Sequence, residues 1–229
     1  MQPNAGASEL AALCATAVAI GAGHTILGPD HYVPFAAMAR AGRWSAAHTV
    51  AVTTACGLGH VAGSVVIGLV GIAAGTALTR IEGLEGLRGD VAAWLLVGTG
   101  LAYAAWGFVQ AVRRRLDGHS HLHAHVQQAA AGTATASVWA PWAMFLVFLF
   151  GPCEPLVPLL MYPAATVSPL AVVAVAAAFA AATVATMVAA VLALRAGCHA
   201  VRAPRLERYG HALAGLAVAA CGLLVVAGL

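Results

Sequence analysis

Apolar residues form long, nearly uninterrupted stretches along most of this chain, and polar residues gather in the short segments between them. Six such stretches lie near residues 10–40, 46–78, 91–112, 137–165, 169–194 and 209–229. Each is long enough to supply the roughly 20 residues that a helix needs to cross the hydrocarbon core of a bilayer. The pattern therefore predicts an all-α integral membrane protein with six transmembrane helices.

Two of these stretches contain helix-breaking residues in nearly the same order. Residues 28–34 read GPDHYVP, and residues 151–158 read GPCEPLVP, so helices 1 and 4 are expected to be kinked. Interrupted segments at matching places in two halves are typical of the inverted repeats of secondary transporters. We therefore expect a first three-helix repeat over residues 1–112, a second over 137–229, and a connecting loop over 113–136.

The distribution of arginine predicts the orientation of the chain in the membrane. Cytoplasmic loops carry an excess of basic residues. Nine of the eleven basic residues follow spans 1, 3 or 5: Arg40, Arg43, Arg113, Arg114, Arg115, Arg195, Arg202, Arg205 and Arg208. These three loops are therefore expected in the cytoplasm, with both termini outside, in a multi-pass protein of the cell inner (plasma) membrane.

The amino-acid composition is that of a protein embedded in a lipid bilayer, and the sequence limits the classes of function that have to be considered. Hydrophobic residues make up 62% of the chain, charged residues 8%, and the mean hydropathy is +0.89. A soluble domain has about one quarter charged residues. Nothing in the chain resembles a nucleotide-binding loop, so the energy for transport is expected from an ion gradient, the gradient of the transported substrate or a partner protein. We expect a transporter and not an enzyme, with no organic cofactor and no nucleic-acid partner.

Acidic residues within the membrane are few. Six of the eight are expected in termini or loops: Glu9, Glu82, Glu85, Asp90, Asp117 and Glu207. Asp30 and Glu154 remain, both in the repeated segments, and no arginine is expected at their depth. Ionisable residues inside a membrane are expensive in free energy and usually functional.

Histidines accompany these carboxylates. His24 and His31 flank Asp30 in the first stretch, and His60 lies within the second. Cys153 and Glu154 add a thiol and a carboxylate from the second half. Imidazole, carboxylate and thiolate together suit borderline divalent ions. The predicted metal site therefore consists of these residues: His24, Asp30, His31, His60, Cys153 and Glu154.

The segment around Asp30 resembles the signature of nickel/cobalt transporters and of the related urease-accessory membrane proteins, in which a histidine is followed by Asp-His after four residues. Here five residues separate His24 from Asp30 and His31. The resemblance implies that Asp30 and His31 are metal ligands and that the substrate is Ni²⁺ or Co²⁺, with Zn²⁺ or Fe²⁺ as further candidates.

The loop between spans 3 and 4 contains alternating histidines. These are His119, His121, His123 and His125. A short histidine-rich tract is a compositional signal for metal binding. We expect the loop to capture ions in the cytoplasm, and a soluble metal-delivery protein is a candidate partner. The loop is similar to the histidine-rich cytoplasmic loops of nickel/cobalt efflux relatives, and this resemblance slightly favours efflux, although such a loop could also receive imported ions.

Two other functions remain open. The Gly-Pro-Cys segment at residues 151–153 is similar to motifs in the membrane parts of thiol-disulfide electron carriers, although such carriers need two cysteines and Asp30 occupies the place that matches Cys153. A sulfur-oxyanion exporter is the other alternative, for which an intramembrane basic residue is expected. The sequence also allows a homodimer.

Overall fold

The computed structural model describes residues 5–75, 78–116, 142–151, 153, 155–166, 168–200 and 208–228. Within these ranges the chain forms helices and no strands. Four helical stretches are long and apolar enough to cross a membrane: Ala7–Leu27, Ala46–Ala73, Arg80–Arg113 and Pro169–Gly197. A shorter apolar helix covers Gly210–Val226. The protein is therefore an all-helical, multi-pass membrane protein.

The first apolar stretch is interrupted where its glycine and prolines predict. Helix α1 covers Ala5–Leu27, a 3₁₀ turn η1 covers Pro29–His31, and helix α2 covers Val33–Ala41. Pro29 and Pro34 lie in the first turns of the two elements that follow the break, where a missing N–H is tolerated. The interruption therefore places Asp30 and His31 on a short turn between two helices.

Helix α3 covers Ala46–Ala73, and Ser45 caps its N-terminus, because Oγ of Ser45 accepts a hydrogen bond from the backbone N–H of His48 (3.1 Å). Helix α4 covers Leu78–Leu116 and is far longer than the expected span at 91–112. Glu82, Glu85 and Asp90 therefore lie on a helix, and their placement in a loop is wrong. Residues 78–90 contain glycine but no proline, so nothing in this polar stretch ends the helix.

The second half repeats the pattern of an interrupted helix followed by two longer ones. A helical segment covers residues 142–150, and helix α6 covers Leu156–Thr166 after a non-helical break. Helix α7 covers Pro169–Ala200 and helix α9 covers Gly210–Val226. Both copies of the repeated segment thus lie between two helical pieces.

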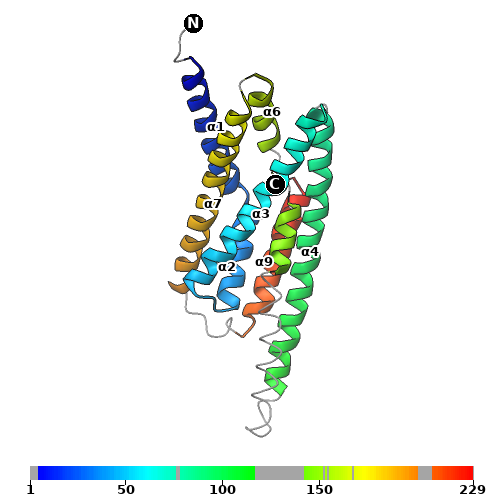
Figure 1. Cartoon of the computed structure of the whole chain (residues 1–229). Helices are drawn as coiled ribbons and strands as arrows, with labels where there is room; N and C mark the ends of the chain where they lie inside the picture. Colours follow the sequence, from blue (N-terminus) through cyan, green and yellow to red (C-terminus); the bar gives the residue numbers. More distant parts are fainter. Residues whose placement is uncertain are drawn as a thin grey trace.

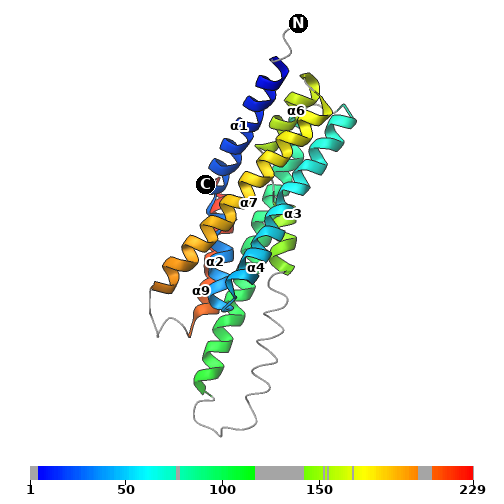
Figure 2. The same cartoon turned by 60° about the vertical axis from the view of Figure 1, so that its left-hand side comes forward.

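The helices of the two halves lie against one another. Helix α1 packs along α7, and α4 packs along α9 (Figures 1 and 2). Helix α7 runs in the same direction as α1 and α4, whereas α9 runs in the direction of α3 (Figure 1). The described helices therefore form one bundle in which each half contributes to the packing of the other.

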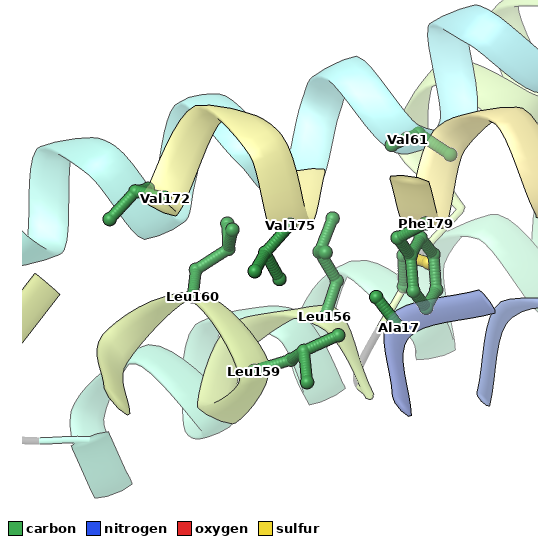
Figure 3. Close-up of a cluster of buried hydrophobic side chains, with 9 residues drawn as sticks. Ala17, Val61, Leu156, Leu159, Leu160, Val172, Val175 and Phe179 are labelled. Atoms are coloured by element: carbon green, nitrogen blue, oxygen red, sulfur yellow. The ribbon is translucent and has the colours of Figure 1, made fainter. Parts of the chain in front are cut away.

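A buried apolar cluster joins four helices beside the second interruption (Figure 3). Leu156 and Leu160 of α6 and Phe179 of α7 are fully buried in it. Ala17 of α1 and Val61 of α3 complete the contact. Cys153 belongs to the same cluster, so the packing of α6 helps to fix the segment that carries this thiol.

Glycines allow α4 and α9 to approach each other closely. A Cβ atom at Gly100 would lie 2.8 Å from the carbonyl oxygen of Gly215, and one at Gly215 would lie 2.6 Å from the carbonyl oxygen of Gly100. Small residues at such contacts let helix backbones pack tightly in a membrane. Gly98, two residues before Gly100 on α4, has nothing within 4 Å of an added Cβ.

We predict that Gly100→Ala lowers the stability of the protein by about 1–3 kcal/mol, because the added methyl group forces α4 and α9 apart. Gly98→Ala is the matched control and should leave the unfolding midpoint unchanged or slightly raised, since alanine is the better helix former. Thermal unfolding of the two variants in the same detergent checks this. Equal midpoints for both would contradict the close contact.

Candidate metal centre

Three potential metal ligands from different parts of the chain meet inside the bundle. His24 lies in the last turn of α1, His60 lies in α3, and Cys153 lies in the second interruption. One ligand atom from each lies within 4.8 Å of the other two. Cys153 is 0% exposed and His60 is 3% exposed. The structure therefore brings together three of the six residues that the sequence predicts as a metal site.

Both helix interruptions help to bring these three ligands together. His24 lies one turn before the first break, and its carbonyl oxygen accepts a hydrogen bond from the N–H of Gly28 (3.0 Å). Gly151 opens the second break next to His60, because a Cβ atom at Gly151 would lie 3.0 Å from Nδ1 of His60. The absence of a side chain at Gly151 leaves room for this imidazole beside the backbone that leads to Cys153.

His31 completes a group of imidazoles around the same point. Its ring centroid lies 4.6 Å from that of His24 and 5.0 Å from that of His60, with both pairs of rings nearly perpendicular. Nδ1 of His31 lies 3.1 Å from Oδ1 of Asp30 and 3.2 Å from the carbonyl oxygen of Gly28. Both oxygens are acceptors, which favours the tautomer that carries its proton on Nδ1, and in this tautomer Nε2 is an acceptor.

The Nε2 atoms of the three histidines are buried, and the described residues offer no hydrogen-bond partner to any of them. Such groups are rare, because a buried polar atom without a partner costs free energy. The ring of Phe148 lies near His31 and His60, with centroid distances of 6.5 and 6.1 Å, and closes one side of the site with apolar surface. Imidazole nitrogens and a thiol in a closed apolar setting are suited to holding a metal ion.

The remaining predicted ligands lie elsewhere or outside the described residues. The Asp30 side chain is 26% exposed and contacts His31, and it is not one of the three converging ligands. Glu154 lies outside the described residues. The same holds for the loop histidines His119, His121, His123 and His125 and for almost all of the loop at 113–136.

The sequence reasoning missed a charged group beside this centre. Glu85 of α4 is 0% exposed and forms an ion pair with Arg88, which lies three residues further along the same helix. Both belong to an apolar helix long enough to span a membrane. The spacing of three residues is the signal in the sequence, because it brings opposite charges together on a helix. The signal applies only within a helix, and the polar character of residues 80–90 predicts a loop.

Arg88 also bears on the oxyanion alternative. Such an exporter is expected to have a basic residue within the membrane, and Arg88 is a largely buried basic residue on a helix that is long and apolar enough to span one. Its guanidinium, however, is paired with Glu85 and donates to the carbonyl oxygens of Leu149 and Gly151 (3.0 and 3.3 Å). The charge is thus already neutralised, and Arg88 is not an open anion site.

Four cysteines have side chains that the structure describes, and all four are free thiols: Cys14, Cys56, Cys153 and Cys221. Cys56 is buried among Phe35, Met144 and Met187, whereas Cys153 belongs to a different cluster. The ligating groups that converge on Cys153 are therefore imidazoles and not a second thiol.

Comparison with known proteins identifies a family. The model of the family described as the cytochrome c biogenesis protein transmembrane region matches residues 32–224. No curated protein and no solved structure matches the chain. The family match supports the likeness to the membrane parts of thiol-disulfide electron carriers, and it gives no support to the resemblance to nickel/cobalt transporters. The chain belongs to the family of the cytochrome c biogenesis protein transmembrane region.

Proposed function

We propose that this protein is a membrane carrier that binds a transition-metal ion between its helices and passes it across the bilayer. The observation that carries the proposal is the convergence of ligand atoms from His24, His60 and Cys153 within 4.8 Å of one another. The buried Nε2 atoms of the neighbouring imidazoles, which have no partner among the described residues, support it further. A bound ion would satisfy these atoms at once.

His31 is the fourth ligand in this proposal, and Asp30 acts through it. The hydrogen bond from Nδ1 of His31 to the Asp30 carboxylate leaves Nε2 free to coordinate, next to His24 and His60. Metal-ligating histidines very often donate their other N–H to a carboxylate or carbonyl in this way, which fixes the ring and raises its basicity. Asp30 thus orients a ligand and adds a negative charge near the ion.

The donor set narrows the class of ion. Thiolate ligands favour Cu⁺ and Zn²⁺, and imidazole suits Zn²⁺, Cu²⁺ and Ni²⁺. Three imidazoles with one thiolate match the tetrahedral N and S coordination of zinc. We therefore rank Zn²⁺ and Cu⁺ above the Ni²⁺ and Co²⁺ that the transporter resemblance implied. The ion is a substrate in this proposal and not a resident cofactor.

The transport model is that of two inverted three-helix repeats, residues 1–112 and 137–229, with the site between the two interruptions. The alternating helix directions and the broken helix at the start of each half support it. The loop at 113–136 with its four histidines is proposed to face the cytoplasm and to receive ions from a soluble delivery protein. A homodimer in the inner membrane is compatible with the same arrangement.

The family match favours a second candidate, thiol-disulfide electron transfer across the membrane. Such transfer needs an attacking thiolate and a second sulfur that it can pair with. Cys153 and Cys56 are the candidate thiols: Cys153 meets His60, and Cys56 lies one turn before His60 on α3, in the cluster that contains Phe148. The two candidates differ in whether Cys56 is required.

We predict that Cys153→Ser lowers the Zn²⁺ affinity by at least about 10- to 100-fold. A loss of about this size is typical when a residue that only orients a ligand is removed, and Cys153 is proposed to be a ligand itself. Cys56→Ser, the matched control, also removes a buried thiol but should leave the affinity unchanged. Titration calorimetry on protein purified in detergent measures both. Equal affinities for the wild type and Cys153→Ser would refute the proposed ligand set.

We predict different outcomes for Asp30→Asn and His31→Ala. The first should lower Zn²⁺ affinity by about 10- to 100-fold, because the amide no longer fixes the tautomer and orientation of His31. The second removes a ligand and should lower it more. If Asp30→Asn instead abolished binding as completely as His60→Ala, the carboxylate would itself be a ligand, and the orienting role would be wrong.

We predict that Cys153 forms no mixed disulfide with a thioredoxin-like protein when Cys56 is replaced by serine. In an electron carrier, removing one thiol of the pair traps the other on its partner, because the resolving sulfur is missing. Non-reducing electrophoresis of membranes treated with acid to quench exchange detects such an adduct. A trapped adduct at Cys153 would establish the second candidate in place of the first.

A further inference from the structure

A buried polar network formed by Ser64, Glu85 and Arg88 surrounds the backbone that carries Cys153. Oγ of Ser64 accepts a hydrogen bond from the N–H of Cys153 (3.0 Å) and donates one to Oε2 of Glu85 (2.8 Å). Oε2 of Glu85 also lies within reach of the same N–H (3.3 Å). The amide of Cys153 is therefore held by a side chain from α3 and another from α4.

Arg88 holds the other side of the same segment. Its Nη2 donates to the carbonyl oxygens of Leu149 (3.0 Å) and Gly151 (3.3 Å), which lie at the end of the helical segment 142–150. Gly63 leaves the space that this requires, because a Cβ atom there would lie 2.5 Å from Nη2 of Arg88 and 2.9 Å from the oxygen of Leu149. Three backbone groups within five residues are thus bound by one network.

The backbone N–H and C=O groups at a helix interruption can be hydrogen-bonded without a buried ion pair. Removing two charges from water costs several kcal/mol per ion, and well-packed apolar replacements for such pairs are often neutral or stabilising. Neutral hydroxyl or amide side chains would also satisfy these backbone groups. The fully buried carboxylate of Glu85 and its partner Arg88 therefore indicate that the backbone leading to Cys153 has to be held in one geometry.

We infer that Ser64, Glu85 and Arg88 are positioning residues that aim Sγ of Cys153 at His24 and His60. This inference rests on the proposed metal-binding function, since it assigns the network a role in that site. Without the network the apolar packing of Cys153 remains, but the hydrogen bonds to the backbone of Leu149, Gly151 and Cys153 are lost. The thiol then moves away from the imidazoles while the histidines stay in place.

The test uses Co²⁺ as a spectroscopic probe bound to purified protein. A thiolate ligand gives an intense near-ultraviolet charge-transfer band, whereas imidazole ligands contribute to the weaker visible bands. The double variant Glu85→Gln with Arg88→Met removes both charges together, so that no unpaired charge is left buried. We expect it to lose most of the charge-transfer band, to keep visible bands, and to bind Co²⁺ about 10- to 100-fold more weakly.

Two further variants separate positioning from folding. Arg88→Lys keeps the charge balance and a donor, so it should retain much of the band that the double variant loses. Thr183→Val removes a buried hydroxyl of α7 that has no hydrogen-bond partner among the described residues, and it should leave the spectrum unchanged. Should the double variant not fold, Ser64→Ala removes only the closest acceptor of the Cys153 amide and is expected to weaken the band.

The failures of the two proposals are distinguishable. If the folded double variant, or Ser64→Ala where that variant is used, shows the charge-transfer band at wild-type strength and binds Co²⁺ with wild-type affinity, the positioning role is wrong. The metal site itself is not affected by that result. A wild-type protein that binds Co²⁺ without any charge-transfer band overturns Cys153 as a ligand, and the positioning role falls with it.

Discussion

Every backbone N–H and C=O group that leaves a helix inside a bilayer needs a partner from the protein, and this requirement governs the two interruptions of this chain. The first break is satisfied locally, since the carbonyl oxygen of Gly28 is approached by Nδ1 of His31 three residues later. The second is satisfied from a distance, by Arg88 of α4. The same constraint is thus met by the His31 side chain within the 3₁₀ turn of the first half, and by Arg88 of a buried ion pair at the second interruption.

The length of helix α4 is connected with the way in which the backbone of the second interruption is hydrogen-bonded. Arg88, which reaches the carbonyl oxygens of Leu149 and Gly151, lies before residue 91, so the helix that carries it includes the polar residues at 80–90. The glycine contacts between α4 and α9 then fix this helix against the second half. Packing, the ion pair and the position of Cys153 are therefore linked through a single element.

The sequence predicts the parts of this structure that depend on local chemistry. Apolar stretches give the helices, and the glycines and prolines at 28–34 and 151–158 give both interruptions. The predicted site of six residues therefore includes the three that converge, His24, His60 and Cys153, but it does not separate them from the other three. Glu85 was placed wrongly because its short-range surroundings are polar, and only contacts with Ser64 and Cys153, distant in sequence, show why it is buried. The role of Asp30 likewise depends on a ring orientation that spacing alone does not specify.

The three converging ligands are divided between the parts of the chain on either side of residues 117–141: His24 and His60 precede this stretch, and Cys153 follows it. Any rearrangement that separates these parts also separates the ligands. In the proposed carrier, ion occupancy and the relative position of the two parts would consequently be coupled, and such coupling is reciprocal. An ion held by all three groups would favour the arrangement described here, and separation of the two parts would lower the affinity by withdrawing the sulfur from the imidazoles. Release from such a carrier would need no competing ligand, because the movement that exposes the ion would also loosen its binding.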